Sequence, residues 1–386
     1  MSYYDVGLWR FDTSIRIMAT DEPMVRHCCL DGNWLGVFQT WQPRVILVTW
    51  FFMRVLQIAN YKEGVGGISS QVSILRKYLR NEGILCDILS TKGSIGKRLC
   101  VFVRLLFIGH NYDVFHIHAC SRWGFLPAVF GITAGRILKR RIVLTYHGGG
   151  ADSFLRKHKQ LALFFLSRTT ANIALSDFVG AIFDKYGIDY VIIPNIIELD
   201  ESKFRKRSTI QPHFVSIRTL AEIYNIECTL RAFARVKNKF LDAKLLVLGD
   251  GPLRLQLESF VLEKEIRDVT FVGHVNNEDI YDYLDKADIM ISSSRVDNMP
   301  VSIMEGMNAG LLVIASRVGG VPYMIDDRET GLLFDSNDDS LLAERMIWGV
   351  TNQTESIQII NKAKQNLAKY SWKEIRKAIM RVYGNE

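Results

Sequence analysis

Apolar and polar positions alternate along most of the chain in two repeating patterns. Short apolar runs, such as residues 53–60, have the length and β-branched content of strands buried inside a sheet. Between them lie longer segments with apolar residues at helical spacing, such as residues 70–79 and 124–138. Strands that alternate with helices in this way predict parallel βαβ units.

The strand-like runs form two series, separated by a polar, basic stretch at residues 200–212 that ends in Pro212 and suits a linker. The first series comprises residues 53–60, 84–89, 114–117, 142–146, 172–175 and 191–193; the second comprises 214–217, 244–248, 269–272, 289–292 and 311–315. We therefore predict an α/β fold with two doubly wound domains, residues 53–209 and 210–370. Ligands of such sheets bind beyond the carboxyl ends of the strands, so a cleft between the domains is the expected site.

Residues 1–52 lack a sustained helical or strand period and hold four of the seven tryptophans. The βα pattern begins abruptly at Met53. We interpret residues 1–52 as an extension upstream of a natural start at Met53, with a regulatory or anchoring arm as the alternative.

Composition narrows the class of protein. A chain of 386 residues with 48% hydrophobic and 23% charged residues is globular, which excludes disordered, collagen-like and disulfide-scaffold proteins. Six scattered cysteines without CxxC spacing indicate free thiols and a cytoplasmic location. The longest apolar run, residues 45–53, is far shorter than the ~20 residues that cross a bilayer.

Charge is concentrated in the middle of the chain. The net charge is −1 for residues 1–52, +12 for 53–210 and −4 for 211–386. This asymmetry indicates either an anionic partner, for which nucleic acid and the inner leaflet of a membrane are the candidates, or simply solvated Lys and Arg faces.

Three short motifs in the first half have more than one interpretation. Gly64-Val-Gly-Gly67 could bring backbone N–H groups to a phosphate or could make a tight turn, and its spacing differs from the dinucleotide-binding pattern. His147-Gly-Gly-Gly150 is similar to the oxyanion loop of lipases, but no Gly-x-Ser-x-Gly elbow accompanies it. His116, His118 and Cys120 alternate along one strand, where local hydrogen bonds are favoured over a zinc site.

A more informative pattern follows the strand near residue 290. The loop 294–300 leads into a predicted helix at 301–308, and Asp297 and Glu305 stand eight residues apart. The helix start offers N–H groups and positive dipole to a diphosphate, while the two carboxylates can accept hydrogen bonds from sugar or ribose hydroxyls. Asp297 could alternatively be a helix cap.

From Met53 onward the chain resembles the retaining family-four glycosyltransferases of the GT-B fold, two Rossmann-like domains that face each other across a cleft. The ordered motifs that carry the resemblance are Gly64-Val-Gly-Gly67, Asp113-Val-Phe-His-Ile-His118, Thr145-Tyr-His-Gly148, Ile193-Pro-Asn195, Leu248-Gly-Asp-Gly-Pro252, Phe271-Val-Gly-His274, Ala287-Asp-Ile-Met290, Asp297 to Glu305, and Val318-Gly-Gly-Val-Pro322.

The resemblance implies roles for particular residues. His147 is expected against the donor sugar, Arg218 on the diphosphate, Asp297 near the sugar hydroxyls and Glu305 on the ribose, and we assign these four to catalysis. The expected donor-binding set comprises Gly66, Gly67, Arg218, Tyr224, Gly273, His274, Val275, Asp297, Asn298, Met299, Pro300, Val301 and Glu305. A C-terminal helix in residues 371–386 should cross back to the first domain.

Three positions depart from the family pattern. The first Glu of the signature is shortened to Asp297 in this chain. A Lys usually stands six residues after the Arg, where this chain has Tyr224, and Pro300 replaces a glycine and has no N–H to donate. These departures bear mainly on which donor is used. They also motivate the alternative that the protein is a catalytically silent GT-B interaction subunit.

The implied reaction is transfer of a sugar from a UDP-sugar or a GDP-sugar with retention of configuration, which releases UDP or GDP and needs no cofactor. Arg218 and the helix dipole would stabilise the leaving diphosphate, and no Asp-x-Asp metal motif occurs. The expected acceptor is a glycan or a polyprenyl-linked glycan, as in bacterial surface polysaccharide synthesis. Basic and apolar residues are mixed on a predicted helix over 97–107, which indicates either peripheral contact with the inner face of an anionic membrane or a core helix with surface cations. No nucleic acid partner or metal is expected.

Overall fold

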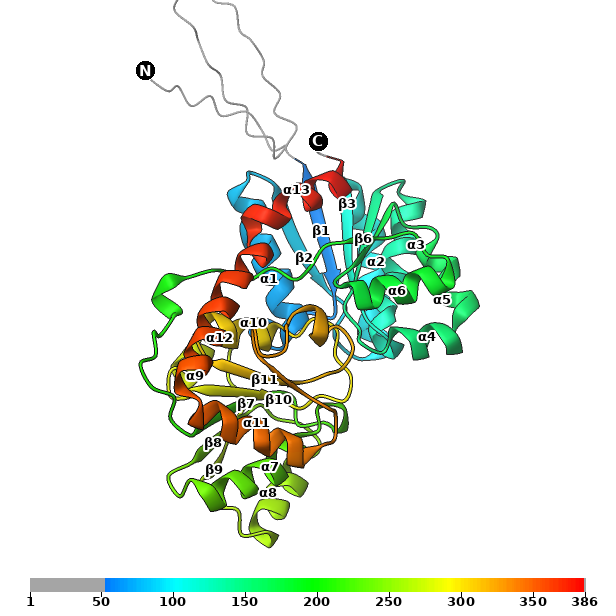
Figure 1. The fold of residues 1–386 in the computed structure, drawn as a ribbon. Helices are drawn as coiled ribbons and strands as arrows, with labels where there is room; N and C mark the ends of the chain where they lie inside the picture. Colours follow the sequence, from blue (N-terminus) through cyan, green and yellow to red (C-terminus); the bar gives the residue numbers. More distant parts are fainter. Residues whose placement is uncertain (1–52, 385–386) are drawn as a thin grey trace, which may run out of the picture. The chain divides into compact units, whose positions relative to one another are not determined.

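The computed structural model describes residues 53–384, so the predicted extension at residues 1–52 lies outside the described residues. In the described part, the alternating pattern forms two parallel sheets of six strands, each flanked by helices (Figure 1). We call these the first lobe and the second lobe. The predicted fold of two doubly wound units is thereby confirmed.

The first sheet has the strand order β2-β1-β3-β4-β5-β6. Its strands are β1 Arg54–Ala59, β2 Leu85–Ser90, β3 Val114–Ala119, β4 Arg141–Tyr146, β5 Ala171–Ala174 and β6 Val191–Ile192. The helices between them are α1 Gly67–Asn81, α2 Ile95–Ile108, α3 Leu126–Ile137, α4 Ala151–Lys157, α5 Lys159–Leu166 and α6 Asp177–Tyr186. Helices α2 to α6 cover one face of this sheet, which is apolar along the central strands, whereas the other face carries buried polar side chains such as His116 and His118.

The second sheet has the order β12-β11-β10-β7-β8-β9. Its strands are β7 His213–Ile217, β8 Lys244–Leu248, β9 Val269–Gly273, β10 Ile289–Ser292, β11 Leu312–Ser316 and β12 Leu332–Phe334. The helices are α7 Ile226–Lys239, α8 Arg254–Glu263, α9 Ile280–Leu284, α10 Val301–Asn308, α11 Asp339–Thr351 and α12 Gln353–Asn366. The sequence analysis did not predict β12, because three residues are too few to show a period.

The last helix, α13 Trp372–Tyr383, packs on the first lobe and covers the other face of its sheet together with α1 (Figure 1). The Trp372 ring stacks on Tyr78 of α1 with 5.2 Å between centroids. At the other end of α13, the fully buried Tyr383 hydroxyl lies 2.6 Å from His116 Nδ1 on β3. Both ends of the chain's described part therefore build the same lobe.

Most side chains of the predicted linker at residues 200–212 are exposed, but one of its cations is buried. Arg207 in this stretch is buried, and its Nε lies 2.8 Å from the carboxylate of Asp288. The same guanidinium donates to the carbonyls of Ala287 and Ala309. A polar, basic composition indicated exposure here, but the fully paired guanidinium allows burial.

Candidate functional site

Arg218 follows β7 at the carboxyl end of the second sheet, in the centre of the candidate site. Its Nη1 donates to Ser302 Oγ at 2.6 Å and its Nη2 to Ser292 Oγ at 3.0 Å. Nη2 also forms an ion pair with Asp297 at 3.0 Å. The Nε–H is buried and has no acceptor among the described residues. A guanidinium held in this way keeps a donor for an oxyanion, since buried N–H groups are normally paired.

Gly249 fixes the main chain that carries Arg218. It follows β8 with a φ of +128°, a conformation that L side chains rarely adopt. A β-carbon there would lie 1.9 Å from the Arg218 carbonyl oxygen. The glycine in Leu248-Gly-Asp-Gly-Pro252 is thus required by the close approach of two strand ends.

Glu305 lies on α10, one turn beyond the residues that bind Arg218. Its side chain makes no hydrogen bond or ion pair within residues 53–384. Burial raises its pKa to about 7, although the positive charges of Arg218 and Lys203 oppose the shift. A half-buried carboxyl without a partner among the described residues is available to accept hydrogen bonds from the hydroxyl groups of a ligand.

Two glycine loops of the first lobe lie against the same part of the second lobe. A β-carbon added at Gly67 would lie 3.5 Å from Val301 Cγ2. One added at Gly149, in the His147-Gly-Gly-Gly150 loop, would lie 2.9 Å from the carbonyl carbon of Asp297. The structure therefore places Gly67 next to Val301 and Gly149 next to Asp297, and position 149 is a glycine because the two backbones approach closely there. Gly66, at the start of α1, faces open space.

Hydrogen bonds across the lobes hold the loop between Asp297 and α10. Ser176 Oγ donates to Asn298 Oδ1 at 2.6 Å, and Asn195 Nδ2 donates to the Met299 carbonyl at 2.8 Å. The Asn298 Nδ2 is buried without an acceptor. Pro300 is the N-cap of α10, so the N–H groups available to an anion at this end begin at Val301.

Tyr224 stands at the place where the family pattern has a lysine. The guanidinium carbon of Arg218 lies 5.6 Å from the Tyr224 ring centroid. Burial raises the pKa of the Tyr224 hydroxyl, so the residue is neutral at physiological pH. It therefore offers a cation–π contact to Arg218 and no charge of its own.

The residues predicted against the base lie on a different strand. Gly273 ends β9, and His274 and Val275 follow it. Strand β8 separates β9 from β7, the strand that precedes Arg218. Their proposed contact with the base stays a prediction.

His147 enters the site from the end of β4. Its Nε2 lies 3.0 Å from His118 Nδ1. His116, the other histidine of the motif, bonds instead to Tyr383 and Thr145. Among residues 53–384, no three His, Cys, Asp or Glu side chains are grouped so that they could hold a metal ion.

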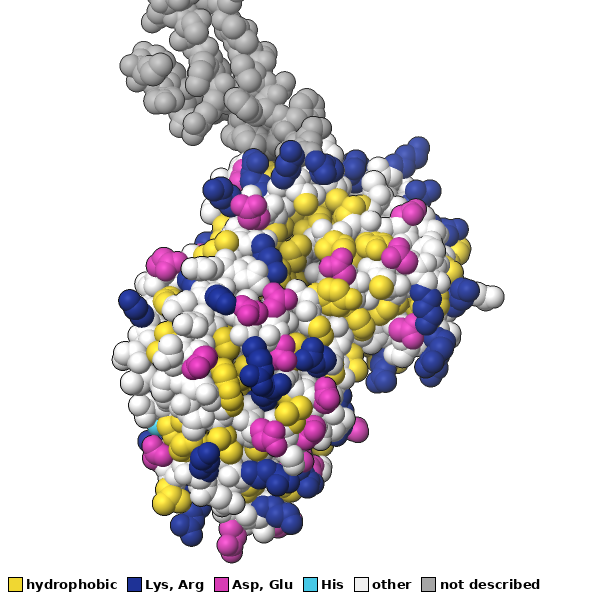
Figure 2. Space-filling view, viewed as in Figure 1, with side chains coloured by type: hydrophobic (Ala, Val, Ile, Leu, Met, Phe, Trp, Pro, Cys, Tyr) yellow, Lys and Arg dark blue, Asp and Glu magenta, His cyan; other side chains and the backbone are white. Residues whose placement is uncertain are grey.

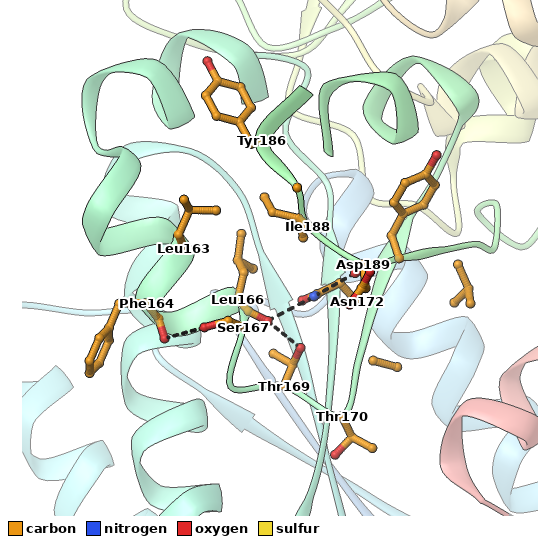
Figure 3. Close-up of a pocket in the computed structure, with 14 residues that line it drawn as sticks. Leu163, Phe164, Leu166, Ser167, Thr169, Thr170, Asn172, Tyr186, Ile188 and Asp189 are labelled. Carbon is orange, nitrogen blue, oxygen red and sulfur yellow. Dashed lines mark hydrogen bonds between the residues drawn. The ribbon is translucent and has the colours of Figure 1, made fainter. Parts of the chain in front are cut away.

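A separate cavity lies away from the candidate site. It has a volume of about 580 Å³ and lies where α5 and α6 end and β5 begins, with Asn172, Thr169, Ile188 and Tyr186 in its wall (Figure 3). This is the amino end of β5, whereas the candidate site lies at the carboxyl ends. None of the predicted site residues lines this cavity.

Sequence reasoning missed Ser292 and Ser302, the two hydroxyls that orient Arg218. Ser292 is a polar residue that ends an otherwise apolar strand, and Ser302 lies in the first turn of α10. Polar residues at strand and helix ends are the signal that could have revealed them.

The two six-stranded parallel sheets with flanking helices have the GT-B architecture, in which Arg218 follows β7 and Glu305 lies on α10. The model for glycosyl transferases group 1 matches residues 200–366, and that for glycosyltransferase family 4 matches residues 89–201. The chain belongs to these family-four glycosyltransferases of the GT-B fold.

Individual proteins agree with this assignment. A glycosyltransferase of Methanocaldococcus jannaschii is 25% identical over 86% of this chain and 98% of its own length. The alpha-monoglucosyldiacylglycerol synthase of Streptococcus pneumoniae is 28% identical over 62% of this chain and 60% of its own. The crystal structure of Anabaena HepE in complex with UDP and glucose superposes with a TM-score of 0.71 at 17% identity, covering 86% of this chain and all of that one.

Proposed function

We propose that the protein transfers a sugar from a UDP-sugar to a glycan or lipid-linked acceptor, with retention of configuration and without a metal. The observation that carries the proposal is Arg218, which is oriented by two serines and one carboxylate yet retains a buried, unpaired Nε–H. UDP is the first choice of donor because HepE, which has the same fold, has been crystallised with UDP and with UDP-glucose. GDP is the second.

In the proposed reaction, the chain's own groups stabilise the leaving diphosphate. Arg218 and the N-terminus of α10 supply positive charge where negative charge develops on the departing oxygen. Asp297 and Glu305 accept hydrogen bonds from sugar and ribose hydroxyls. No step in this scheme needs a divalent cation.

Calorimetric titration with UDP and GDP in the presence of EDTA tests the donor site. We expect one nucleotide to bind, and Glu305→Ala to weaken it about tenfold or more through loss of charged hydrogen bonds. The exposed Glu278 makes no ion pair within the described residues, so Glu278→Ala is the matched control. If neither nucleotide binds, the interaction-subunit alternative takes precedence.

The acceptor side of the proposal rests on the surface of α2. Leu99, Val103 and Phe107 lie on successive turns and are 60%, 47% and 73% exposed. Lys97 and Arg104 on the same helix are exposed as well. Apolar rows flanked by cations suit an anionic membrane surface, where a lipid-linked acceptor would reside.

Further cations lie on neighbouring helices of the same layer. Lys and Arg side chains line the outer end of the first lobe over α4 and α5 (Figure 2). They include Arg156, Lys157 and Lys159. None of the helices in residues 53–384 is long and apolar enough to cross a membrane.

Cosedimentation with vesicles of phosphatidylglycerol and phosphatidylcholine tests the membrane contact. We expect binding that falls with salt and is lost in the double variant Leu99→Asp, Phe107→Asp. The second lobe provides a control, because Leu255 and Leu262 on α8 are exposed to a similar degree. If Leu255→Asp and Leu262→Asp on α8 weaken vesicle binding as much as the α2 substitutions do, a specific role for α2 is refuted.

A further inference from the structure

Three imidazoles lie side by side at the carboxyl ends of β3 and β4. The ring centroids of His116 and His118 are 4.4 Å apart, and those of His118 and His147 are 5.2 Å apart. Only His147 is part of the proposed donor site. The question is what a second buried histidine, His118, does behind it.

The orientation of one neighbouring amide is fixed by its partners. Gln57 on β1 is fully buried, and its Nε2 donates to the Val72 carbonyl at 3.0 Å. A carbonyl can only accept, so the Gln57 Oε1 must face the other way, toward His118 Nε2 at 2.9 Å. An amide oxygen also only accepts. The proton of the His118 ring is therefore on Nε2.

Both histidines in the chain of hydrogen bonds are neutral. Burial holds the pKa of His118 well below its ordinary value and lowers that of His147 to about 4. Neither ring is hydrogen-bonded to a carboxylate within the described residues. A neutral ring carries one proton, so His118 Nδ1 is unprotonated and accepts a hydrogen bond.

That acceptor faces His147 Nε2 at 3.0 Å, so the proton between the two rings belongs to His147. The remaining nitrogen of His147, Nδ1, is then unprotonated as well. The Val72 carbonyl, Gln57, His118 and His147 thus form one chain of hydrogen bonds. The carbonyl fixes the orientation of the Gln57 amide, the amide fixes the tautomer of His118, and His118 fixes the tautomer of His147.

We infer that Gln57 and His118 are positioning residues that hold His147 in its Nε2–H tautomer, so that Nδ1 accepts a hydrogen bond from a hydroxyl of the bound sugar. The inference rests on the proposed function, in which His147 lies against the donor sugar. The inference also predicts a preference among donor sugars. The sugar must present a hydroxyl group to His147 Nδ1, because a group that has only lone pairs would be repelled by the lone pair of that nitrogen.

Nitrogen NMR of the histidine rings tests the tautomer without any ligand. Long-range proton–nitrogen spectra of protein labelled at histidine distinguish protonated from unprotonated ring nitrogens, and His147→Gln identifies the His147 signals by their loss. We expect Nε2 protonated and Nδ1 unprotonated in both His118 and His147 at pH 7. A protonated His147 Nδ1 would overturn the inference.

Binding tests the contact with sugar. Gln57→Met removes the amide oxygen at similar volume, and we expect mixed tautomers and a loss of UDP-glucose affinity of about 3- to 10-fold with little change for UDP. Thr145→Val is the control, because Thr145 bonds only to His116 in this cluster. Equal weakening of UDP and UDP-glucose would indicate a structural effect and refute the positioning role.

The two proposals can fail separately. If the unaltered protein does not bind UDP, the donor site and the sugar contact are both refuted, whereas the tautomer is still decided by the NMR measurement. If UDP and UDP-glucose bind but the tautomer is the other one, the donor site stands and the positioning role is wrong.

Discussion

Replacing Glu305 by glutamine should stabilise the protein at alkaline pH while weakening its binding of nucleotide. The folded protein raises the pKa of Glu305 from 4.5 to about 7, so folding favours the protonated carboxyl. The sign follows from linkage: the stabilisation is complete below pH 4.5 and is lost as the pH rises through 7. Between pH 5 and pH 8 the ionised carboxylate costs about 2–3 kcal/mol that a glutamine does not, or roughly 3–5 °C in melting temperature.

Thermal unfolding of Glu305→Gln and the unaltered protein at pH 5 and pH 8 measures this effect. We expect nearly equal melting temperatures at pH 5 and a higher one for the variant at pH 8. Glu278→Gln, at the exposed control position, should show no such pH dependence. Calorimetric titration at pH 8 should show that the more stable variant binds nucleotide less well. We expect Glu305→Gln to bind UDP about tenfold more weakly than the unaltered protein, because the charged acceptor is gone. A variant that is no more stable at pH 8 than at pH 5, relative to the unaltered protein, would refute the reasoning.

Three further substitutions test the remaining geometry. Arg218→Lys removes the forked donor and should weaken UDP about tenfold or more by calorimetry; unchanged affinity would contradict the role of Arg218. Gly149→Ala puts a methyl group 2.9 Å from the Asp297 carbonyl carbon, so turnover measured as UDP release should fall about tenfold, and a fully active variant would show that the loops need not approach. Tyr224→Lys adds a charge beside Arg218 and should tighten UDP binding about tenfold with a steeper salt dependence; weaker binding would show that the tyrosine is required.

Much of the fold could be predicted because parallel strands buried on both faces leave unbroken apolar runs. Strands β8 and β10 have the same bounds as the predicted strands 244–248 and 289–292. Strand β12 was not predicted, because three residues are too few to show a period. The docking of Arg207 could not be predicted, since its partner Asp288 lies far away in sequence and charge pattern says nothing about pairing at that distance.

For the site, the residue types were predictable and their partners were not. Strand ends and a helix start indicated Asp297 and Glu305, and the resemblance added Arg218. Which serines orient the guanidinium, and that Arg218 keeps one donor unpaired, depend on side-chain contacts that sequence spacing does not specify. The role of Gln57 was also not predictable. In the sequence it is a single polar residue in a buried strand, and only the structure shows its hydrogen bonds with the Val72 carbonyl and His118.

The return of α13 to the first lobe has a consequence for how the protein is made. Buried side chains of α13, including Ile375, Ile379 and Tyr383, complete the core beside β1 and β3, strands that are synthesised some three hundred residues earlier in the chain's order. The first lobe therefore cannot finish folding on the ribosome before the second has been translated. A chain that lacked α13 would leave one face of the first sheet open.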